Sequence, residues 1–577
     1  MTFVQYITIL ICFSMNLISQ IPADRVFDWS NAGSKSNFKY NKIIVLNKEQ
    51  LNIEQLSNST ILNNLIIENQ GKSVQIILPE GSFTFDKPIN LKSNISLKGQ
   101  GAEKTELIFD LDGTGHCINI NGSAENSKLI LSKDILLKEK KIIAKSDNFI
   151  NNNVWLKIEF EDKALLFSDW AYGSVAQIQK VNNVIGDTIF LNSEFRREFK
   201  ISDVVKIMNI NPIENVSIEC LKIKRLDNTT PEQTSNINFS YAVNSRVYNI
   251  ESENCNFSHI QASYSSNLVI SNSYLHDAFE YGGGGRAYGV LLHFSTGEVL
   301  AENNIFKHLR HSMILQAGAN GNVFAYNYSV EPFWSETSLP ENSSGDMVLH
   351  GNYVFANLFE NNICQNIVID NSHGANGAFN TIFRNRAELW GIFFSADSSP
   401  SQNIIGNEIT NNNFPYNLLN YNILGENHFL FANNNKGNFS PNKPDSLPIK
   451  SLYYKHKPEF LSESEFGGIG FPNDVNSNSI PAKKRFDMKS IFNLPCIEEV
   501  NGVKQQDKPF YVYPNPSSNF ISLNCEIVSD NLMIVDLLGI EVLNYTFINS
   551  YTINISSLNS GIYFIVYEGN IIKFIKI

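Results

Sequence analysis

Short apolar runs separated by turn residues dominate the sequence after Val74. The stretch VQIILPEGSFTFDKPINLKSNISLKGQGAEKTELIF alternates β-branched and aromatic residues with Gly, Pro, Asn and Asp, and it shows no helical period. This pattern predicts short strands joined by tight turns. Residues from about 130 to 210 are less regular but contain apolar segments such as VWLKIEF, so we expect a β-rich insertion there.

A motif recurs after Asn215: two or three apolar strand residues, an asparagine, one free residue and often another apolar residue. Its asparagines are spaced 31, 24, 34, 24 and 22 residues apart, and they are Asn272, Asn303, Asn327, Asn361, Asn385 and Asn407. Periods of this length are typical of stacked repeats, with one such strand in each coil of a parallel β-helix. Asparagine tolerates the left-handed conformation of a turn, and its amide can bond the equivalent amide one coil above. We therefore assign these asparagines to the architecture rather than to catalysis.

The chain begins with an apolar run, MTFVQYITILICFSMNLIS, which is shorter than the roughly 20 apolar residues of a membrane span. Its length predicts a signal peptide over residues 1–19, although no Lys or Arg precedes the run. No second apolar stretch of spanning length follows. We expect an exported protein without a helical membrane anchor.

Composition narrows the classes of protein further. A hydrophobic fraction of 43% with 18% charged residues indicates a folded chain, and 577 residues are too many for one compact core. The net charge of -12 would repel a phosphate backbone, so we expect no nucleic-acid partner. We also expect a monomer. The cysteines after the signal peptide show no metal-type spacing and are expected to be isolated buried thiols: Cys117, Cys220, Cys255, Cys364, Cys496 and Cys525.

The front of the chain resembles a known superfamily. In ILPEGSFTFDKPINLKSNISLKGQGAEKTELIF, a Pro-x-Gly turn and an aromatic residue precede a strand ending in Gly-x-Gly, as in the opening coils of the pectate-lyase-like right-handed β-helix superfamily. With the asparagine repeats, the resemblance covers roughly residues 24 to 420. It implies an all-β chain with a right-handed parallel β-helix (solenoid), which we place at residues 20–485. The superfamily includes lyases, hydrolases, epimerases and binding proteins, so the resemblance implies architecture more than activity.

The end of the chain carries a second resemblance. YVYPNPSSNFISL, LMIVDLLGIEVLNY and INISSLNSGIYFIVYEGNIIKFIKI resemble, motif by motif, the type IX secretion (Por) C-terminal sorting domain over about residues 508–577. Alternating apolar strands with Asn and Gly turns also predict a small β-sandwich here. The resemblance implies passage across the outer membrane by the type IX secretion machinery, followed by release or surface anchoring. A polar linker is expected over residues 486–507.

Candidate chemistry concentrates in the middle of the chain, where seven of the ten histidines lie between residues 259 and 373. β-Elimination on a uronate polymer requires neutralisation of the carboxylate, a base for the proton next to it and a donor for the departing oxygen. Arginine can supply the first function, and histidine or tyrosine the others. The candidate catalytic residues are Tyr281, Arg286, His308, Arg310 and His311.

Other residues of this region are candidates for binding a glycan. The polar candidates are His276, Asp277, Glu280, His293 and Gln316, and the candidates for stacking on sugar rings are Trp334 and Trp390. The glycines from Gly282 to Gly285 predict either a loop that lets a ligand approach the backbone or a flexible turn. The histidine spacings match no zinc motif, and the sequence leaves a calcium requirement open.

Three hypotheses for the function follow. The favoured one is a secreted lyase that cleaves an acidic polysaccharide, because Arg and His are concentrated in an otherwise acidic chain. The alternative is a non-catalytic glycan-binding or adhesin-like surface protein, because no catalytic motif is complete. The third is a glycoside hydrolase or a uronate epimerase, although hydrolysis would require paired carboxylates and the paired-Asp strand motif of β-helix polygalacturonases is absent.

Overall fold

The computed structural model divides the chain into two units, residues 1–496 and residues 497–577. In the first unit it describes residues 21–51, 56–127, 129–145, 152–229, 232–418, 421–461, 466, 468–492 and 496. In the second it describes residues 512–523, 532–536, 541–545, 552–567 and 570–577. The predicted signal peptide lies outside the described residues, as does most of the predicted linker. Among the described residues, no helix is long and apolar enough to cross a membrane.

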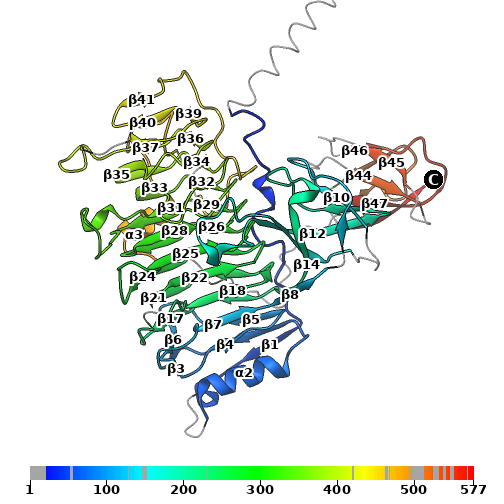
Figure 1. The fold of residues 1–577 in the computed structure, drawn as a ribbon. Helices are drawn as coiled ribbons and strands as arrows, with labels where there is room; N and C mark the ends of the chain where they lie inside the picture. Colours follow the sequence, from blue (N-terminus) through cyan, green and yellow to red (C-terminus); the bar gives the residue numbers. More distant parts are fainter. Residues whose placement is uncertain are drawn as a thin grey trace, which may run out of the picture. The chain divides into compact units, whose positions relative to one another are not determined.

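The first unit is a parallel β-helix, in which three ladders of short parallel strands run along the stack of coils (Figure 1). The first ladder consists of β1 (Lys42–Val45), β2 (Val74–Ile77), β5 (Ile95–Lys98), β16 (Ser217–Glu219), β20 (Arg246–Tyr248), β23 (Val269–Ser271), β26 (Leu300–Glu302), β29 (Val323–Ala325), β32 (Leu358–Glu360), β34 (Thr381–Phe383), β36 (Asn403–Ile405) and β39 (Phe429–Phe431).

The second and third ladders share two long strands, β33 (Ile363–Asp370) and β35 (Arg386–Phe394). The other strands of the second ladder are β3 (Gly81–Phe85), β6 (Thr105–Phe109), β17 (Lys222–Arg225), β21 (Glu251–Cys255), β24 (Tyr274–Ala278), β27 (Ile305–Lys307), β30 (Tyr328–Val330), β37 (Glu408–Ile409) and β40 (Asn433–Asn435), the last of which pairs with the antiparallel β41 (Asn438–Ser440). Those of the third are β4 (Ile89–Asn90), β7 (Ile118–Asn121), β18 (Ile237–Ser240), β22 (Ser258–Ser263), β25 (Tyr288–His293), β28 (His311–Leu315), β31 (Met347–His350) and β38 (Tyr421–Asn422). A short parallel pair, β15 (Ile213–Glu214) and β19 (Ala242–Val243), lies between coils.

Apolar side chains from all three ladders fill the interior of the stack. Helix α2 (Asn58–Glu68) closes its first coil, since buried Leu62 and Ile66 pack on the core and Asn58 donates to the Thr84 carbonyl at 2.9 Å. A covered end leaves fewer unpaired strand edges for association with another chain. The smaller helices are η1 (Trp29–Asn31), η2 (Lys48–Gln50), η3 (Asp169–Ala171), η4 (Ile201–Asp203), η5 (Glu341–Ser343) and α3 (Pro481–Asp487).

A seven-stranded antiparallel sheet projects from the side of the stack, where the sequence predicts a β-rich insertion (Figure 1). Its strands, in spatial order, are β8 (Ser123–Asn126), β14 (Val204–Asn211), β11 (Trp155–Phe160), β12 (Ala176–Ile185), β13 (Thr188–Leu191), β10 (Lys141–Lys145) and β9 (Ile130–Leu131). The insertion has an apolar core of its own, which includes Leu156, Ile158 and Phe195. It is therefore a separate wall beside the β-helix rather than an irregular coil.

The repeated asparagines divide two structural tasks between them. Asn272, Asn303 and Asn361 have positive φ values of 59°, 54° and 55° at the turns between strands. A buried ladder of amide hydrogen bonds links one coil to the next through Asn304, Asn327, Asn362, Asn385, Asn407 and Asn433. Both expected roles are present, but where two asparagines are adjacent the first adopts the turn conformation and the second joins the ladder.

After Ser440 the chain turns back along the stack as a return segment, residues 441–496. Its described residues contact several coils of the stack: Leu452 donates to Glu360, Tyr454 donates to Glu302, and Arg485 donates to Asn303. A disulfide between Cys496 and Cys220 fastens its end. The β-helix coils therefore end before residue 485, and the described residues of the return segment cover the outside of the stack.

The disulfide corrects the expectation of isolated thiols for two cysteines. Cys220 and Cys496 are 276 residues apart in sequence, but the return segment brings their Cα atoms to 5.7 Å. Cys117, Cys255 and Cys364 are free and buried, as expected. Cys525 lies outside the described residues.

The second unit contains two small antiparallel sheets. One has the order β42 (Val512–Tyr513), β43 (Phe520–Leu523) and β46 (Thr552–Asn554), and the other β45 (Glu541–Tyr545), β44 (Leu532–Val535), β47 (Gly561–Tyr567) and β48 (Asn570–Lys576). Ile521 and Ile553 of the first sheet share a buried core with Ile534, Ile565 and Phe574 of the second. The unit is therefore a small β-sandwich, as the sequence predicts.

Candidate functional site

The third ladder presents polar side chains on its outer face. Side chains alternate along each strand, so His293 at the end of β25 points outward from the neighbouring core residue Leu292. The parallel register places Ser263 of β22 beside His293, and His350 of β31 beside Asp370 of β33. A column of polar side chains thus runs along the outside of the stack.

A cavity of about 410 Å³ opens over this column. Its polar and aromatic lining from the β-helix includes Tyr288, His293, Arg310, Gln316, His350 and His373. The glycine loop and the insertion form other walls, to which they contribute Gly284, Gly285 and Trp170. None of the described residues that line it is Asp or Glu. The cavity is therefore rich in imidazole and poor in carboxylate.

Arg310 supplies a guanidinium group to this cavity. Its side chain is only 8% exposed and lies over the rings of Trp334 and Tyr288, at 5.3 and 5.9 Å from their centroids. Nη1 donates to the Gly282 carbonyl at 2.7 Å, whereas Nε is buried without a hydrogen-bond partner among the described residues. A buried charged donor without a partner is costly. The position therefore favours an anionic ligand that completes its hydrogen bonds.

His350 is oriented by a carboxylate. Its Nδ1 lies 2.5 Å from Oδ2 of Asp370. Burial by itself would raise the pKa of Asp370, but the adjacent His350 and hydrogen bonds from Ser372 outweigh burial and hold that pKa well below its usual range. Asp370 is thus ionised at neutral pH and lies against Nδ1 of His350 without an aligned hydrogen bond, which leaves Nε2 of His350 for a ligand.

His311 lies beside His350, with ring centroids 5.4 Å apart. Its Nδ1 lies 2.8 Å from the Gly345 carbonyl, and because a carbonyl only accepts, Nδ1 carries the proton. Burial, together with the Arg310 guanidinium, lowers the pKa of His311 well below its usual range, so the ring is neutral and Nε2 keeps a lone pair. Burial also lowers the pKa of His293 to about 3.

The loop from Gly282 to Gly285 packs against neighbouring side chains at its two ends. Gly284 and Gly285 have φ values of 79° and 77°, which glycine adopts without steric cost. A Cβ on Gly282 would lie 2.3 Å from a carboxylate oxygen of Glu336, and one on Gly285 would lie 2.5 Å from Nε2 of Gln233. The loop therefore brings its backbone to the cavity wall, which favours the first of the two alternatives for these glycines.

Several of the predicted catalytic residues do not line the cavity. The ring of Tyr281 packs against His308 and Phe333, with centroids 4.7 and 5.2 Å away, and burial raises the pKa of Tyr281. Arg286 forms an ion pair with Glu280. Of the five predicted catalytic residues, only Arg310 lines the cavity, and its neighbour His311 packs against the lining residue His350.

His276 and Asp277 lie on the second ladder instead. Burial by itself would lower the pKa of His276, but hydrogen bonds to Asp277 and Glu251 outweigh it and raise the pKa. Among the described residues, His276, Glu251 and Glu253 form a group with metal-ligand atoms within 4.8 Å of one another. The ammonium group of Lys222 already binds both glutamates, at 3.0 and 2.5 Å. Lys222 thus provides, in place of a metal ion, the positive charge that Glu251 and Glu253 require.

The two predicted stacking residues have different surroundings. Trp334 packs against Arg310 behind the cavity. Trp390 is 4% exposed, its Nε1 donates to Asn342 at 3.1 Å, and its ring contacts Tyr416. Trp390 therefore packs inside the protein and is not among the described residues that line the cavity.

The sequence pattern does not single out His350, Asp370, His373 and Trp170 as site residues. Two of them, His350 and His373, belong to the histidine enrichment between residues 259 and 373. Asp370 is recognised only from its register with His350. Trp170 comes from the insertion, whose position beside the cavity no local pattern indicates.

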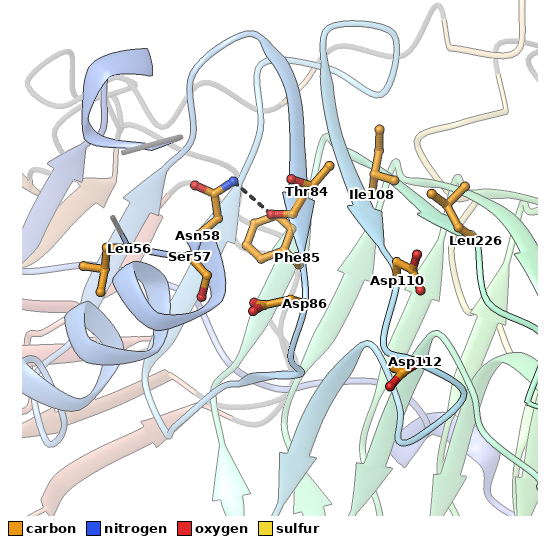
Figure 2. A pocket seen from close by; sticks show the side chains of 10 residues that line it. All are labelled: Leu56, Ser57, Asn58, Thr84, Phe85, Asp86, Ile108, Asp110, Asp112 and Leu226. Atoms are coloured by element: carbon orange, nitrogen blue, oxygen red, sulfur yellow. Dashed lines mark hydrogen bonds between the residues drawn. The ribbon is translucent and has the colours of Figure 1, made fainter. Parts of the chain in front are cut away.

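A larger cavity, of about 660 Å³, lies at the first coils beside α2 (Figure 2). Figure 2 shows the carboxylates of Asp86, Asp110 and Asp112 arranged along it. None of the described residues that line it is His, Lys or Arg. It would repel an acidic glycan and offers no group to neutralise a carboxylate, so the smaller cavity is the better candidate.

The C-terminal unit matches a family model. Residues 511–576 match the family described as "Secretion system C-terminal sorting domain". This unit is a type IX sorting domain. The sorting domain marks the protein for secretion or for attachment at the outer-membrane surface, and it implies interaction with the secretion machinery.

The chain is also similar to solved structures of low sequence identity. One is the tailspike protein gp49 from Pseudomonas phage LKA1, with 13% identity, a TM-score of 0.43, and coverage of 65% of this chain and 71% of that chain. Another is the catalytic domain of a GH87 alpha-1,3-glucanase in complex with tetrasaccharides, with 12% identity, a TM-score of 0.38, and coverage of 71% and 58%. A third is an iota-carrageenase complexed to iota-carrageenan fragments, with 11% identity, a TM-score of 0.31, and coverage of 63% and 61%. No curated protein sequence matches the chain.

Proposed function

We propose that the protein is a secreted lyase that cleaves a uronate-containing polysaccharide by β-elimination in the cavity over the third ladder. The observation that carries this proposal is the composition of the cavity. Among the described residues, the buried Arg310 guanidinium has an unfilled donor, several imidazoles lie beside it, and no carboxylate lines the cavity. An arginine that binds the uronate carboxylate makes the neighbouring C–H more acidic, and an imidazole can accept the proton.

The groups present allow a complete assignment of roles. Arg310 binds the carboxylate, and Nε2 of His350 takes the proton at C5 while Asp370 stabilises the imidazolium. The electrons of that C–H bond form the C4–C5 double bond, and the C4–O bond breaks. The departing oxygen receives the proton from His350. His311 packs against His350 and is assigned a positioning role.

Hydrolysis is less well supported, because it requires two carboxylates on either side of the bond and no lining residue among those described carries one. An epimerase would share the first step and return the proton to C5, so it would give no unsaturated product. A glycan-binding surface protein would bind the same anionic polymer without changing it. The products therefore distinguish the three alternatives.

The test uses the purified mature chain with pectate, alginate, glycosaminoglycans and ulvan, with and without calcium, and follows the ultraviolet absorbance of unsaturated uronate. We expect Arg310→Ala and His350→Ala each to lower kcat/KM by at least about 100-fold. Arg286→Ala and His308→Ala are matched controls outside the cavity and should keep most of the activity. Full activity in His350→Ala would contradict the assignment of the base. New reducing ends without absorbance would indicate a hydrolase, and binding without any product would indicate the surface-protein alternative.

A further inference from the structure

The insertion presents exposed aromatic side chains next to the cavity. Phe167, Trp170 and Tyr172 lie on one short loop and are 71%, 48% and 43% exposed. Trp170 itself lines the cavity, and its ring makes edge contacts with His373 and Phe294, at centroid distances of 5.5 and 5.8 Å. Clusters of exposed apolar groups commonly mark binding surfaces.

The loop that carries these rings is held in place on both sides. The Asn352 side chain accepts hydrogen bonds from the backbone amides of Phe167 and Ser168, at 3.0 and 3.1 Å. At the other end, the carboxylate of Asp162 accepts from the amide of Gly173 at 3.1 Å. The exposure of the rings is therefore a property of an ordered loop.

The whole insertion is also fixed against the β-helix. Arg196 of the insertion forms a buried ion pair with Glu298 at 2.5 Å and donates to Asn320 at 2.9 Å, and both charged side chains are 2% exposed. The hydroxyl of Ser295 donates to the Ser174 carbonyl at 2.7 Å. These contacts set the distance between the aromatic loop and the cavity before any ligand binds.

We infer that Trp170, with Phe167 beside it, forms a sugar-stacking subsite at the rim of the cavity. This subsite binds the sugar ring next to the one held at Arg310 in the same glycan chain. The inference rests on the proposed function and extends it. A cavity of about 410 Å³ encloses only a short segment of a polymer, so a long chain must leave across the rim.

The chemistry of the rim suits a sugar. The C–H face of a pyranose ring is apolar and packs on an aromatic face, while its hydroxyls stay hydrated at the exposed edge. The surface also continues into a cavity whose lining includes Gln316, His373 and Arg310, groups that hydrogen-bond hydroxyls and carboxylates. A protein partner would instead meet an apolar patch that ends in a polar hollow.

The test compares Trp170→Ala and Phe167→Ala with Phe190→Ala, a matched control on β13 of the same insertion, where the side chain is 36% exposed and does not line the cavity. Kinetics are measured with two substrates. One is the full-length polymer that the unmodified protein cleaves, and the other is the shortest oligosaccharide of that polymer that the unmodified protein still cleaves. We expect Trp170→Ala to raise KM about tenfold on the polymer, with kcat nearly unchanged and little effect on the short substrate. Phe190→Ala should behave as the unmodified protein.

Other results overturn the inference. Unchanged KM on the polymer in Trp170→Ala would refute the subsite and leave the lyase assignment intact. Equal losses on long and short substrates would show that the loop only supports the fold. Failure of the unmodified protein to cleave any polymer would count against the proposed function, and affinity electrophoresis in gels containing the same polymers would still decide the subsite. Retention weakened by Trp170→Ala and not by Phe190→Ala supports it, whereas equal retention, or no retention of the unmodified protein, refutes it.

Discussion

Glu360 provides a sharp test of how the return segment packs on the β-helix. Its side chain at the end of β32 is fully buried, and it accepts hydrogen bonds from the hydroxyl of Ser451 at 2.5 Å and from the amide of Leu452 at 2.7 Å. Burial raises the pKa of Glu360 from 4.5 to about 7, although these hydrogen bonds and the nearby Arg384 oppose the rise. We predict that Glu360→Gln stabilises the protein at neutral pH.

The magnitude follows from proton linkage. Between pH 4.5 and about 7, the folded state keeps a proton on Glu360 that the unfolded chain loses, so the stability of the unmodified protein falls as pH rises through this window. A shift of this size corresponds to about 3 kcal/mol at ~1.4 kcal/mol per pKa unit. Glutamine carries no proton to lose, and it can accept from Leu452 and donate to Ser451. The advantage of Glu360→Gln should therefore grow by about 3 kcal/mol across the window.

Denaturant unfolding followed by tryptophan fluorescence at a series of pH values measures this difference. Glu103→Gln, at an exposed position, is the control and should show a difference that does not depend on pH. If the difference between Glu360→Gln and the unmodified protein stayed constant from pH 4.5 to above 7, the carboxyl group would not be protonated in the fold. The assignment of the return segment as a desolvating cover would then be wrong.

Two further predictions concern the architecture. Asn362 bonds the ladder amides on both sides, so Asn362→Ala should lower the free energy of unfolding by about 3 kcal/mol in the same assay, and a loss under about 1 kcal/mol would show that the ladder contributes little. Cys220→Ser frees the end of the return segment, so limited proteolysis should cut residues 441–496 faster than in the unmodified chain, and equal cleavage rates would show that the other contacts suffice.

The fold could be predicted because the same strand-and-asparagine motif recurs, and each copy adds support for stacked coils. A single apolar run such as VISNSY fits a strand or a core segment, but six asparagines at similar spacings fit little except stacked coils. The sequence does not distinguish turn asparagines from ladder asparagines, because Asn303 and Asn304 are adjacent and only the backbone shows that Asn303 takes the positive φ. The return segment could not be predicted, since its contacts with Glu360 and Glu302 carry no periodicity.

The candidate site was predicted only where its residues are close in sequence. Arg310 and His311 follow one another, and His293 lies on the strand paired with β28, so a local concentration of His and Arg reveals them. Arg286 belongs to the same local concentration of His and Arg, but it pairs with Glu280 instead of lining the cavity. The direction in which a side chain leaves the coil depends on the preceding turn, which the local concentration does not reveal. His350 and Asp370 meet only because the loop and strand lengths between them bring β31 and β33 into register.

The position of the insertion beside the cavity could not be predicted from the repeats of the coils alone. Ser168 lies 205 residues from His373, and yet its hydroxyl is 3.4 Å from Nδ1 of that ring. Without this wall the outer face of the third ladder would be an open strip of polar side chains, in which Arg310 would be hydrated and an anion would gain little. The wall turns the strip into a cavity where Nε of the buried Arg310 guanidinium has no hydrogen-bond partner among the described residues. What distinguishes this β-helix chemically is therefore the segment inserted between its coils, and variants of that segment should change substrate choice before they change the fold.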